Sequence, residues 1–242
     1  MRMPDTSELL HVWELGSCQS AAARALMLMA ATVPDEDSMA LARLSIGQRD
    51  AMLLDIRDAL FGSSIRCVTE CAECGESIEL DFNIEEVRVP HGDNACAYQL
   101  GSDGYDVKFR LPDSNDLLAL HSELPTQAER RLLARCVLEA TANGEKVNVE
   151  QLPEEILSAL SQGISEADPQ ADVLLEVSCP VCSNVMPAPF DIVSHLWAEL
   201  DAWAKRMLRE VHTLAYSYGW SETEILRMSA TRRRLYLDLI ET

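Results

Sequence analysis

Apolar residues recur every three or four positions near both ends of the chain, a spacing typical of amphipathic helices. In the N-terminal part this spacing predicts helices over residues 19–32 and 47–60, which Pro34 and Gly62 bring to an end. Near the C-terminus, the same spacing continues through residues 191–218 and predicts one long helix. Both ends of the chain are therefore expected to be helical.

In the middle of the chain, apolar and polar residues alternate, so that an apolar residue recurs at every second position. Alternating residues predict short strands over 64–69 and 77–82, and another over 173–178 that is followed by a further extended run. A second pair of strands, 95–100 and 105–111, is separated by a glycine-rich turn. These runs predict small antiparallel hairpins rather than one large sheet.

Further helices are expected between the hairpins, over residues 114–123, 127–141 and 153–163. The second of these rests on one apolar stripe: Leu132, Leu133, Cys136, Val137 and Ala140. Together the patterns predict an α+β fold that is mainly helical, with a small β-core and a long C-terminal helical segment.

Two cysteine pairs carry the strongest chemical signal. Cys71 and Cys74 lie at the tip of one predicted hairpin, and Cys179 and Cys182 lie at the tip of another. A gap of two residues lets both sulfurs of a pair face one ion, and two such pairs make the tetrahedral site typical of structural zinc. We therefore expect one structural zinc ion, although four thiolates also suit iron. Such a site has no open position for a substrate water.

Other interpretations of the cysteines are weaker. A thioredoxin-like redox motif lies at a helix N-terminus within a βαβ unit, and neither pair has that context. Four unrelated thiols would not be expected to form two C-x-x-C motifs, each after a strand. The remaining cysteines are expected to be small buried residues: Cys18, Cys67, Cys96 and Cys136.

The distance between the two pairs predicts an interrupted ribbon, because more than one hundred residues separate Cys74 from Cys179. The expected organisation is N-terminal helices over 1–62, a split zinc-ribbon core over 63–84 and 173–190, an inserted α+β subdomain over 85–172, and a C-terminal helical region over 191–242. A metal ion would then join the two ends of the insertion.

Charge limits the possible partners. The 242 residues include 40 acidic and 20 basic side chains, a net charge of −20, which opposes binding to nucleic acid or to an anionic membrane surface. All of this excess lies within residues 1–195, whereas residues 196–242 are neutral. No apolar stretch is long enough to span a membrane, and the start of the chain does not resemble a secretory signal. A cytoplasmic protein is expected.

No catalytic motif is present in the sequence. It contains no phosphate-binding loop, no H-E-x-x-H and no G-x-S-x-G, and its five histidines are scattered. We therefore expect no enzymatic activity and no small-molecule substrate.

Aromatic and basic residues near the C-terminus are candidates for partner binding. They are Trp197, Trp203, Trp220, Arg232 and Arg233. Tryptophan and arginine are enriched at protein interfaces, but the tryptophans are equally consistent with a helical core and the arginines with a solvated helix face. Trp220, at a turn between helices, is the better candidate for an exposed anchor.

Several short motifs are shared with a known family. They include Phe190-Asp191, Leu196-Trp197, Trp203-Ala204, Glu210-Val211-His212, Tyr218-Gly219-Trp220-Ser221, Arg232-Arg233, Arg110-Leu111-Pro112 and Asp168-Pro169-Gln170-Ala171-Asp172. With them, most of the chain resembles the baseplate proteins of contractile-tailed phages and related injection systems, often described as hub or hub-assembly proteins of the T-even type.

The resemblance implies a non-enzymatic component or assembly chaperone of a contractile tail, whose partners are baseplate or hub subunits. Such a protein is made in the cytoplasm and joins the tail particle if it remains in the finished baseplate. The alternative is a zinc-ribbon adaptor or regulatory protein unrelated to tails.

Overall fold

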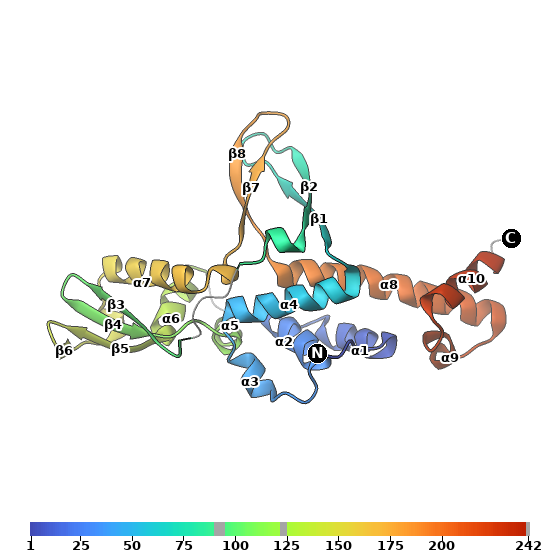
Figure 1. Ribbon diagram of the computed structural model, residues 1–242, viewed down its shortest axis with the longest axis horizontal. Helices are drawn as coiled ribbons and strands as arrows, with labels where there is room; N and C mark the ends of the chain where they lie inside the picture. The colour runs from blue at the N-terminus through green and yellow to red at the C-terminus, as the bar shows by residue number, and fades with distance from the viewer. Residues whose placement is uncertain (90–94, 122–124, 241–242) are drawn as a thin grey trace.

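A helical body forms the centre of the molecule in the computed structural model, which describes residues 1–89, 95–121 and 125–240 (Figure 1). The first part of the long helix α8 packs against the N-terminal helices. The N-terminal helices are α1 (Thr6–Gly16), α2 (Ala21–Thr32), α3 (Ser38–Ala42) and α4 (Ile46–Phe61). The predicted helices 19–32 and 47–60 are thus present as α2 and α4, whereas α1 and α3 were not predicted individually.

The body is held together by a continuous apolar core of seventeen buried residues. Leu53 and Leu196 are fully buried in it, on α4 and α8 respectively. Trp197 also lies in this core, where its ring packs against Gly16 and under the guanidinium of Arg24, 4.6 Å from the ring centroid. A Cβ at Gly16 would lie 2.3 Å from that ring, so only glycine fits.

Two antiparallel hairpins stand on the body and form a projection that we call the tower (Figure 1). The first pairs β1 (Ser64–Glu70) with β2 (Ser77–Asn83), and the second pairs β7 (Leu174–Ser178) with β8 (Val185–Pro189). The two sheets share a small core that includes Ile78, Val177 and Ala188.

A separate lobe lies on the other side of the body from the C-terminus (Figure 1). Its own apolar core, which includes Val107 and Leu160, lies between a four-stranded antiparallel sheet and the helices that cover it. The elements of this part of the chain are β3 (Tyr98–Ser102), β4 (Tyr105–Phe109), α5 (Ser114–Leu120), α6 (Pro125–Cys136), β5 (Val137–Ala142), β6 (Glu145–Lys146) and α7 (Glu154–Ala167). Three short 3₁₀ helices, Ile84–Glu86, Val149–Gln151 and Pro169–Ala171, occur in the connections.

The predicted helix over 127–141 is wrong in its last turn. Helix α6 ends at Cys136, and residues Val137–Ala142 form β5, which pairs with β4. The reason lies in the following turn, where Asn143 and Gly144 both adopt positive φ, at 51° and 86°. An Asn-Gly turn of this kind favours a hairpin and so fixes β5 and β6 as strands.

The C-terminal region consists of α8 (Ile192–Tyr218), α9 (Glu222–Leu226) and α10 (Ala230–Ile240). Helix α8 has 27 residues and ends at Gly219, whose φ of 69° is the left-handed conformation that suits glycine. Beyond the body, α9 and α10 fold back on the end of α8 around Val211, Leu214 and Ile225.

The expected α+β fold, mainly helical and with a long C-terminal helix, is confirmed. Within the described parts of the chain, none of the helices has the combination of length and apolar character that crossing a membrane requires.

Candidate functional site

The tip of the tower brings all four cysteines of the two pairs together. The Sγ atoms of Cys71, Cys74, Cys179 and Cys182 all lie within 4.8 Å of one another. Two of these contacts join the hairpins, with Sγ–Sγ distances of 3.6 Å from Cys71 to Cys182 and 3.6 Å from Cys74 to Cys179. The cluster therefore links segments that lie more than one hundred residues apart in the sequence.

Backbone geometry at each tip turns the sulfurs inward. The N–H of Gly75 donates to the carbonyl of Cys71, and the N–H of Ser183 donates to the carbonyl of Cys179. Gly75 and Ser183 both have positive φ, at 71° and 59°. Each hairpin thus ends in the same tight turn, which presents both cysteines of its pair to one point.

The spacing of the sulfurs suits a tetrahedral metal ion. With a zinc–sulfur distance of about 2.3 Å, the sulfurs of a tetrahedral site lie about 3.8 Å apart. The two distances of 3.6 Å are close to this value and much longer than a disulfide bond. Four cysteines in this arrangement could hold a metal ion.

The electrostatics of the cluster also favour a cation. Backbone N–H groups of Cys74 and Glu73 lower the pKa of Cys71 to about 6, which stabilises one thiolate. At Cys74 the backbone N–H of Glu76 acts in the same direction, but burial and the neighbouring sulfurs outweigh it and raise the pKa to about 12. A second thiolate is therefore disfavoured unless a positive charge lies between the sulfurs.

The remaining cysteines do not join this cluster. Cys136 is buried as expected, and Cys67 is half-buried on β1. Cys18 and Cys96 are exposed, so the expectation that they are buried is wrong. Both lie outside the helices and strands, where no apolar face covers them.

A buried ion pair fastens the base of the tower to the body. Arg57 on α4 is 2% exposed; it donates to both carboxylate oxygens of Glu199 on α8 and to the carbonyls of Gly62 and Ser64. Partial burial alone would raise the pKa of Glu199, but His195 and Arg57 outweigh it and lower that pKa to about 2. The sequence did not reveal this pair, because its partners are 142 residues apart.

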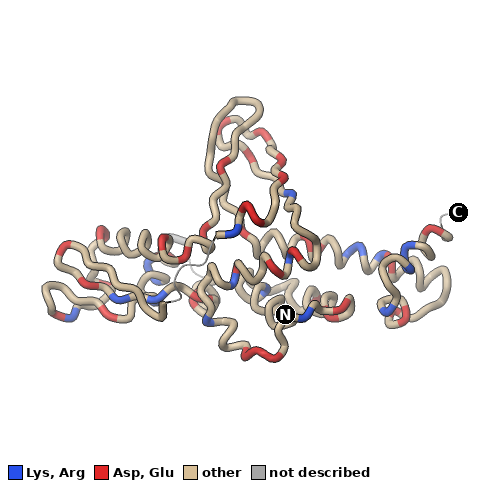
Figure 2. Tube along the Cα trace, viewed as in Figure 1, with Lys and Arg blue, Asp and Glu red and all other residues tan. Residues whose placement is uncertain are grey.

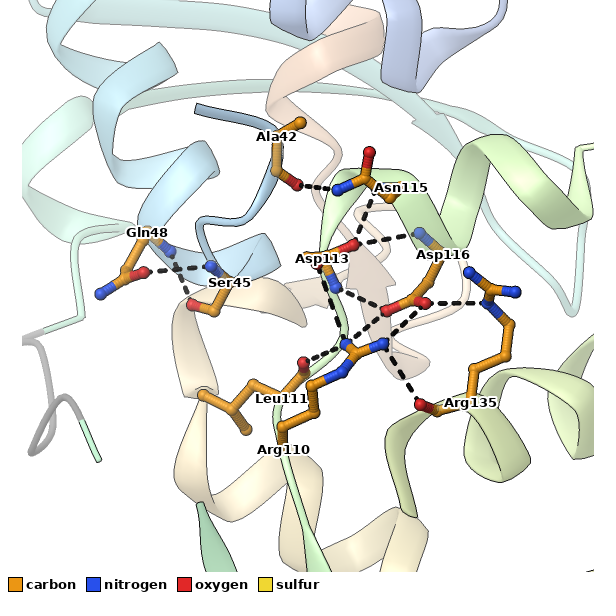
Figure 3. A network of polar contacts seen from close by, with 9 residues as sticks. All are labelled: Ala42, Ser45, Gln48, Arg110, Leu111, Asp113, Asn115, Asp116 and Arg135. Carbon is orange, nitrogen blue, oxygen red and sulfur yellow. Dashed lines mark hydrogen bonds and ion pairs between the residues drawn. The ribbon is translucent and has the colours of Figure 1, made fainter. Parts of the chain in front are cut away.

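A second network lies where the lobe meets the body (Figure 3). Asp116, which is fully buried, accepts hydrogen bonds from Arg110 at 2.6 and 2.9 Å and from Arg135 at 2.8 Å. The neighbouring Asn115 donates to the carbonyl of Ala42 on the body. The shared motif around Arg110-Leu111-Pro112 thus has a structural explanation: its arginine holds the buried carboxylate at this junction.

The candidate partner residues are not all on the surface. Trp197 and Arg233 are buried, and Trp203 is half-buried against α1, as one of the residues around Leu10 and Met207. Arg233 donates to Glu210 on α8 and to the carbonyl of Met228. These contacts hold α10 against α8, so burial gives both Trp197 and Arg233 a structural role within the chain.

Trp220 and Arg232 lie at the outer end of the molecule. Trp220 is half-buried and stacks on Tyr218 with ring centroids 4.4 Å apart, while Tyr236 meets it edge-on at 4.8 Å. Arg232 is exposed and lies over the ring of Tyr236. These residues form a small aromatic cluster at the junction of α8, α9 and α10.

Comparison with known proteins identifies the family. No curated protein and no solved structure matches the chain. The family model described as T4 bacteriophage base plate protein matches residues 19–196, which cover helices α2 to α4 of the body, the lobe, the tower and the first five residues of α8. Because this match extends over most of the chain, the protein belongs to the family of T4-type phage base plate proteins.

Proposed function

We propose that the protein is a non-enzymatic component of a phage-type contractile tail, or a chaperone for the assembly of its baseplate hub, and that it acts by binding other tail proteins. The observation that carries this proposal is the family match over residues 19–196. The partners we propose are baseplate or hub subunits.

The proposal includes one structural zinc ion held by Cys71, Cys74, Cys179 and Cys182. The close approach of the four sulfurs supports it. When bound, zinc would supply a closed, redox-inert crosslink between the two hairpins. The chain itself contributes the two tight turns that direct the sulfurs inward and the anionic sulfur of Cys71, which backbone N–H groups stabilise.

We further propose that residues 85–172 act as a subdomain inserted in the split ribbon. The separate core of the lobe supports this division. The tower, the N-terminal helices over 1–62 and the helical region over 191–242 would then form the frame that carries the insertion. Among the candidate partner residues, Trp203, Trp220 and Arg232 are those that the fold leaves partly or fully accessible.

A gene deletion tests the role in tails. Removing this gene from a host that produces the tail should abolish complete baseplates, because a necessary subunit or assembly factor is missing. Electron microscopy of the particles and mass spectrometry of purified wild-type tails give the readout. The chain within purified tails indicates a resident component, and its absence from them indicates a chaperone.

The matched control restores the gene with the exposed Cys18 replaced by serine, which should assemble normal tails. Complete, functional tails in the deletion strain would contradict the proposed function.

A further inference from the structure

The outer part of the C-terminal region differs in charge from the rest of the molecule. We call residues 202–240, which comprise the last seventeen residues of α8 together with α9 and α10, the arm. The arm has seven basic and four acidic residues, a net charge of +3 in a chain of −20. Figure 2 shows basic positions along this part of α8 and on α10.

Several arginines of the arm have no side-chain partner among the described residues. The side chains of Arg206, Arg209, Arg227 and Arg234 are exposed, and none makes an ion pair or hydrogen bond with another residue in the described ranges. This is notable in a chain with 40 acidic residues. Guanidinium groups without partners are suited to bidentate binding of carboxylates.

Apolar side chains are also exposed on the arm. On α10, Leu235 and Leu239 are one helical turn apart and are 61% and 67% exposed, while Tyr216 near the end of α8 is 87% exposed. The opposite face of α10 is occupied, because Leu237 and Ile240 pack toward Val211 and Leu214. On α10 the two exposed leucines lie close in the sequence to the exposed Arg234, a combination typical of protein-binding surfaces.

The tower has acidic and exposed apolar residues, which complement the basic and apolar residues of the arm. Its strands and tips, residues 64–83 and 174–189, contain six acidic residues and one basic residue. On the outer face of the first hairpin, Val68 is 63% exposed and pairs across the strands with Glu79. Glu70 follows Val68 on the same face, and Arg66, which is paired with Asp81, precedes it. The described charged residues of this face are Arg66, Glu70, Glu79 and Asp81, a net charge of −2 around an exposed valine, which complements the exposed leucines and Arg234 of the arm.

One copy cannot bring these two surfaces together. Two residues connect the end of β8, at the foot of the tower, to the start of helix α8. The helix has 27 residues and is about 40 Å long at 1.5 Å per residue. The arm is at the far end of this helix, well away from the tower (Figure 1). The arm can therefore contact a tower only when that tower belongs to another copy of the chain.

We propose that the arm of one copy docks on the outer face of the β1–β2 hairpin of a second copy, head to tail. An interface between two different surfaces of the same chain generates a ring when the rotation closes and an open chain when it does not. Repulsion between the acidic bodies is screened beyond about 8 Å at physiological salt, whereas the docked charges are in direct contact. The proposal stands independently of the tail function proposed above.

Sedimentation of the full chain over a concentration series tests it. The wild type should form dimers or larger species. Two double variants should each weaken this association at least about tenfold, equivalent to ~1.4 kcal/mol: Arg227→Glu/Arg234→Glu on the arm and Glu70→Lys/Glu79→Lys on the tower. The tower variant has a smaller net charge than the wild type, so general repulsion predicts the opposite result for it.

Mixing the two variants gives the sharpest outcome, because their reversed charges complement each other and association should return. Arg43→Glu/Lys108→Glu, which reverses two exposed charges on the body and the lobe, serves as the matched control and should associate like the wild type. Thermal melts establish that each variant is folded. A wild type that remains monomeric, or association that neither variant weakens, would overturn the proposal, while leaving the proposed tail function intact.

Discussion

The tower and the helical body are built on different physical principles. The body is built around one core of seventeen buried apolar residues, which include Leu53, Leu196 and Trp197 and also Ile65 at the foot of the tower. The tower's own core, within the described residues, has five buried residues, of which two are the cysteines Cys71 and Cys179. Isolated two-stranded hairpins are marginal in water, so the body can be stable through packing whereas the tower needs a crosslink. The four cysteines lie where such a crosslink is needed.

The largest expected effect is loss of the tower on metal removal. Cys179→Ser, or a strong chelator, should remove on the order of 10 kcal/mol of binding free energy and unfold the hairpins. Hydrogen exchange should show β1 and β7 losing protection while α2 and α4 keep theirs. Cys18→Ser, an exposed cysteine outside the cluster, is the control. A tower that stays protected after chelation would show that packing alone holds it.

Removal of a core side chain should have the next largest effect, this time on the body. Leu196→Ala creates a cavity in the main core and should lower the free energy of unfolding by about 3 kcal/mol. Leu174→Ala, at a position 57% exposed on the tower, should change it by less than about 0.5 kcal/mol. Urea denaturation of both variants measures the two changes in the free energy of unfolding. Equal losses in the two variants would contradict the difference between body and tower.

The ion pair at the base of the tower should contribute less than a core leucine at neutral pH, and in a pH-dependent way. Glu199→Gln leaves the buried Arg57 without its charge partner and should cost about 2–3 kcal/mol, allowing for the partial exposure of Glu199.

The lowered pKa of Glu199, about 2, fixes the pH window of this contribution. It is fully present above the ordinary glutamate pKa of about 4.3 and is lost as pH falls toward 2. Acid denaturation of wild type and variant should therefore converge at low pH. A constant difference between them down to pH 2 would mean that the charge of Glu199 is not responsible. Glu145→Gln, at an exposed position on β6, is the control.

The smallest effect is expected in the arm, which depends on local helix signals rather than on a large core. Ser221 caps α9: its hydroxyl accepts a hydrogen bond from the N–H of Glu224, whose carboxylate reaches back to the N–H of Ser221. Ser221→Ala should cost about 1 kcal/mol and increase exchange of the α9 amides alone. Spread of this effect into α4 would show that arm and body unfold together.

Much of the fold could be predicted from local patterns. The helices α2, α4 and α8 and the hairpins of the tower follow from apolar spacing, and the two C-x-x-C motifs indicated which hairpins would meet. Two local signals were overlooked. Asp5 and Glu8 form a capping box that marks the start of α1, and Asn143-Gly144 marks the hairpin that replaces the last turn of the predicted helix 127–141.

The rest depended on long-range contacts that one sequence does not reveal. Asp116 resembles an ordinary solvated carboxylate until Arg135, nineteen residues away, is seen to contact it. Arg233 belongs to a basic run that is typical of a solvated face, yet Glu210 makes it a buried contact between α8 and α10. Burial of a charged residue is decided by its partner, and the partner is fixed only by the fold.

The most direct test of whether a metal ion joins the two hairpins of the tower is the metal content of the freshly purified wild-type chain. A tower joined by zinc predicts one zinc ion per chain by native mass spectrometry and elemental analysis, and none in the Cys179→Ser variant prepared beside it. A wild type without metal, with freely reactive thiols or disulfides at the four cysteines, would contradict a metal-joined tower. One iron per chain would preserve the crosslink and correct the identity of the ion.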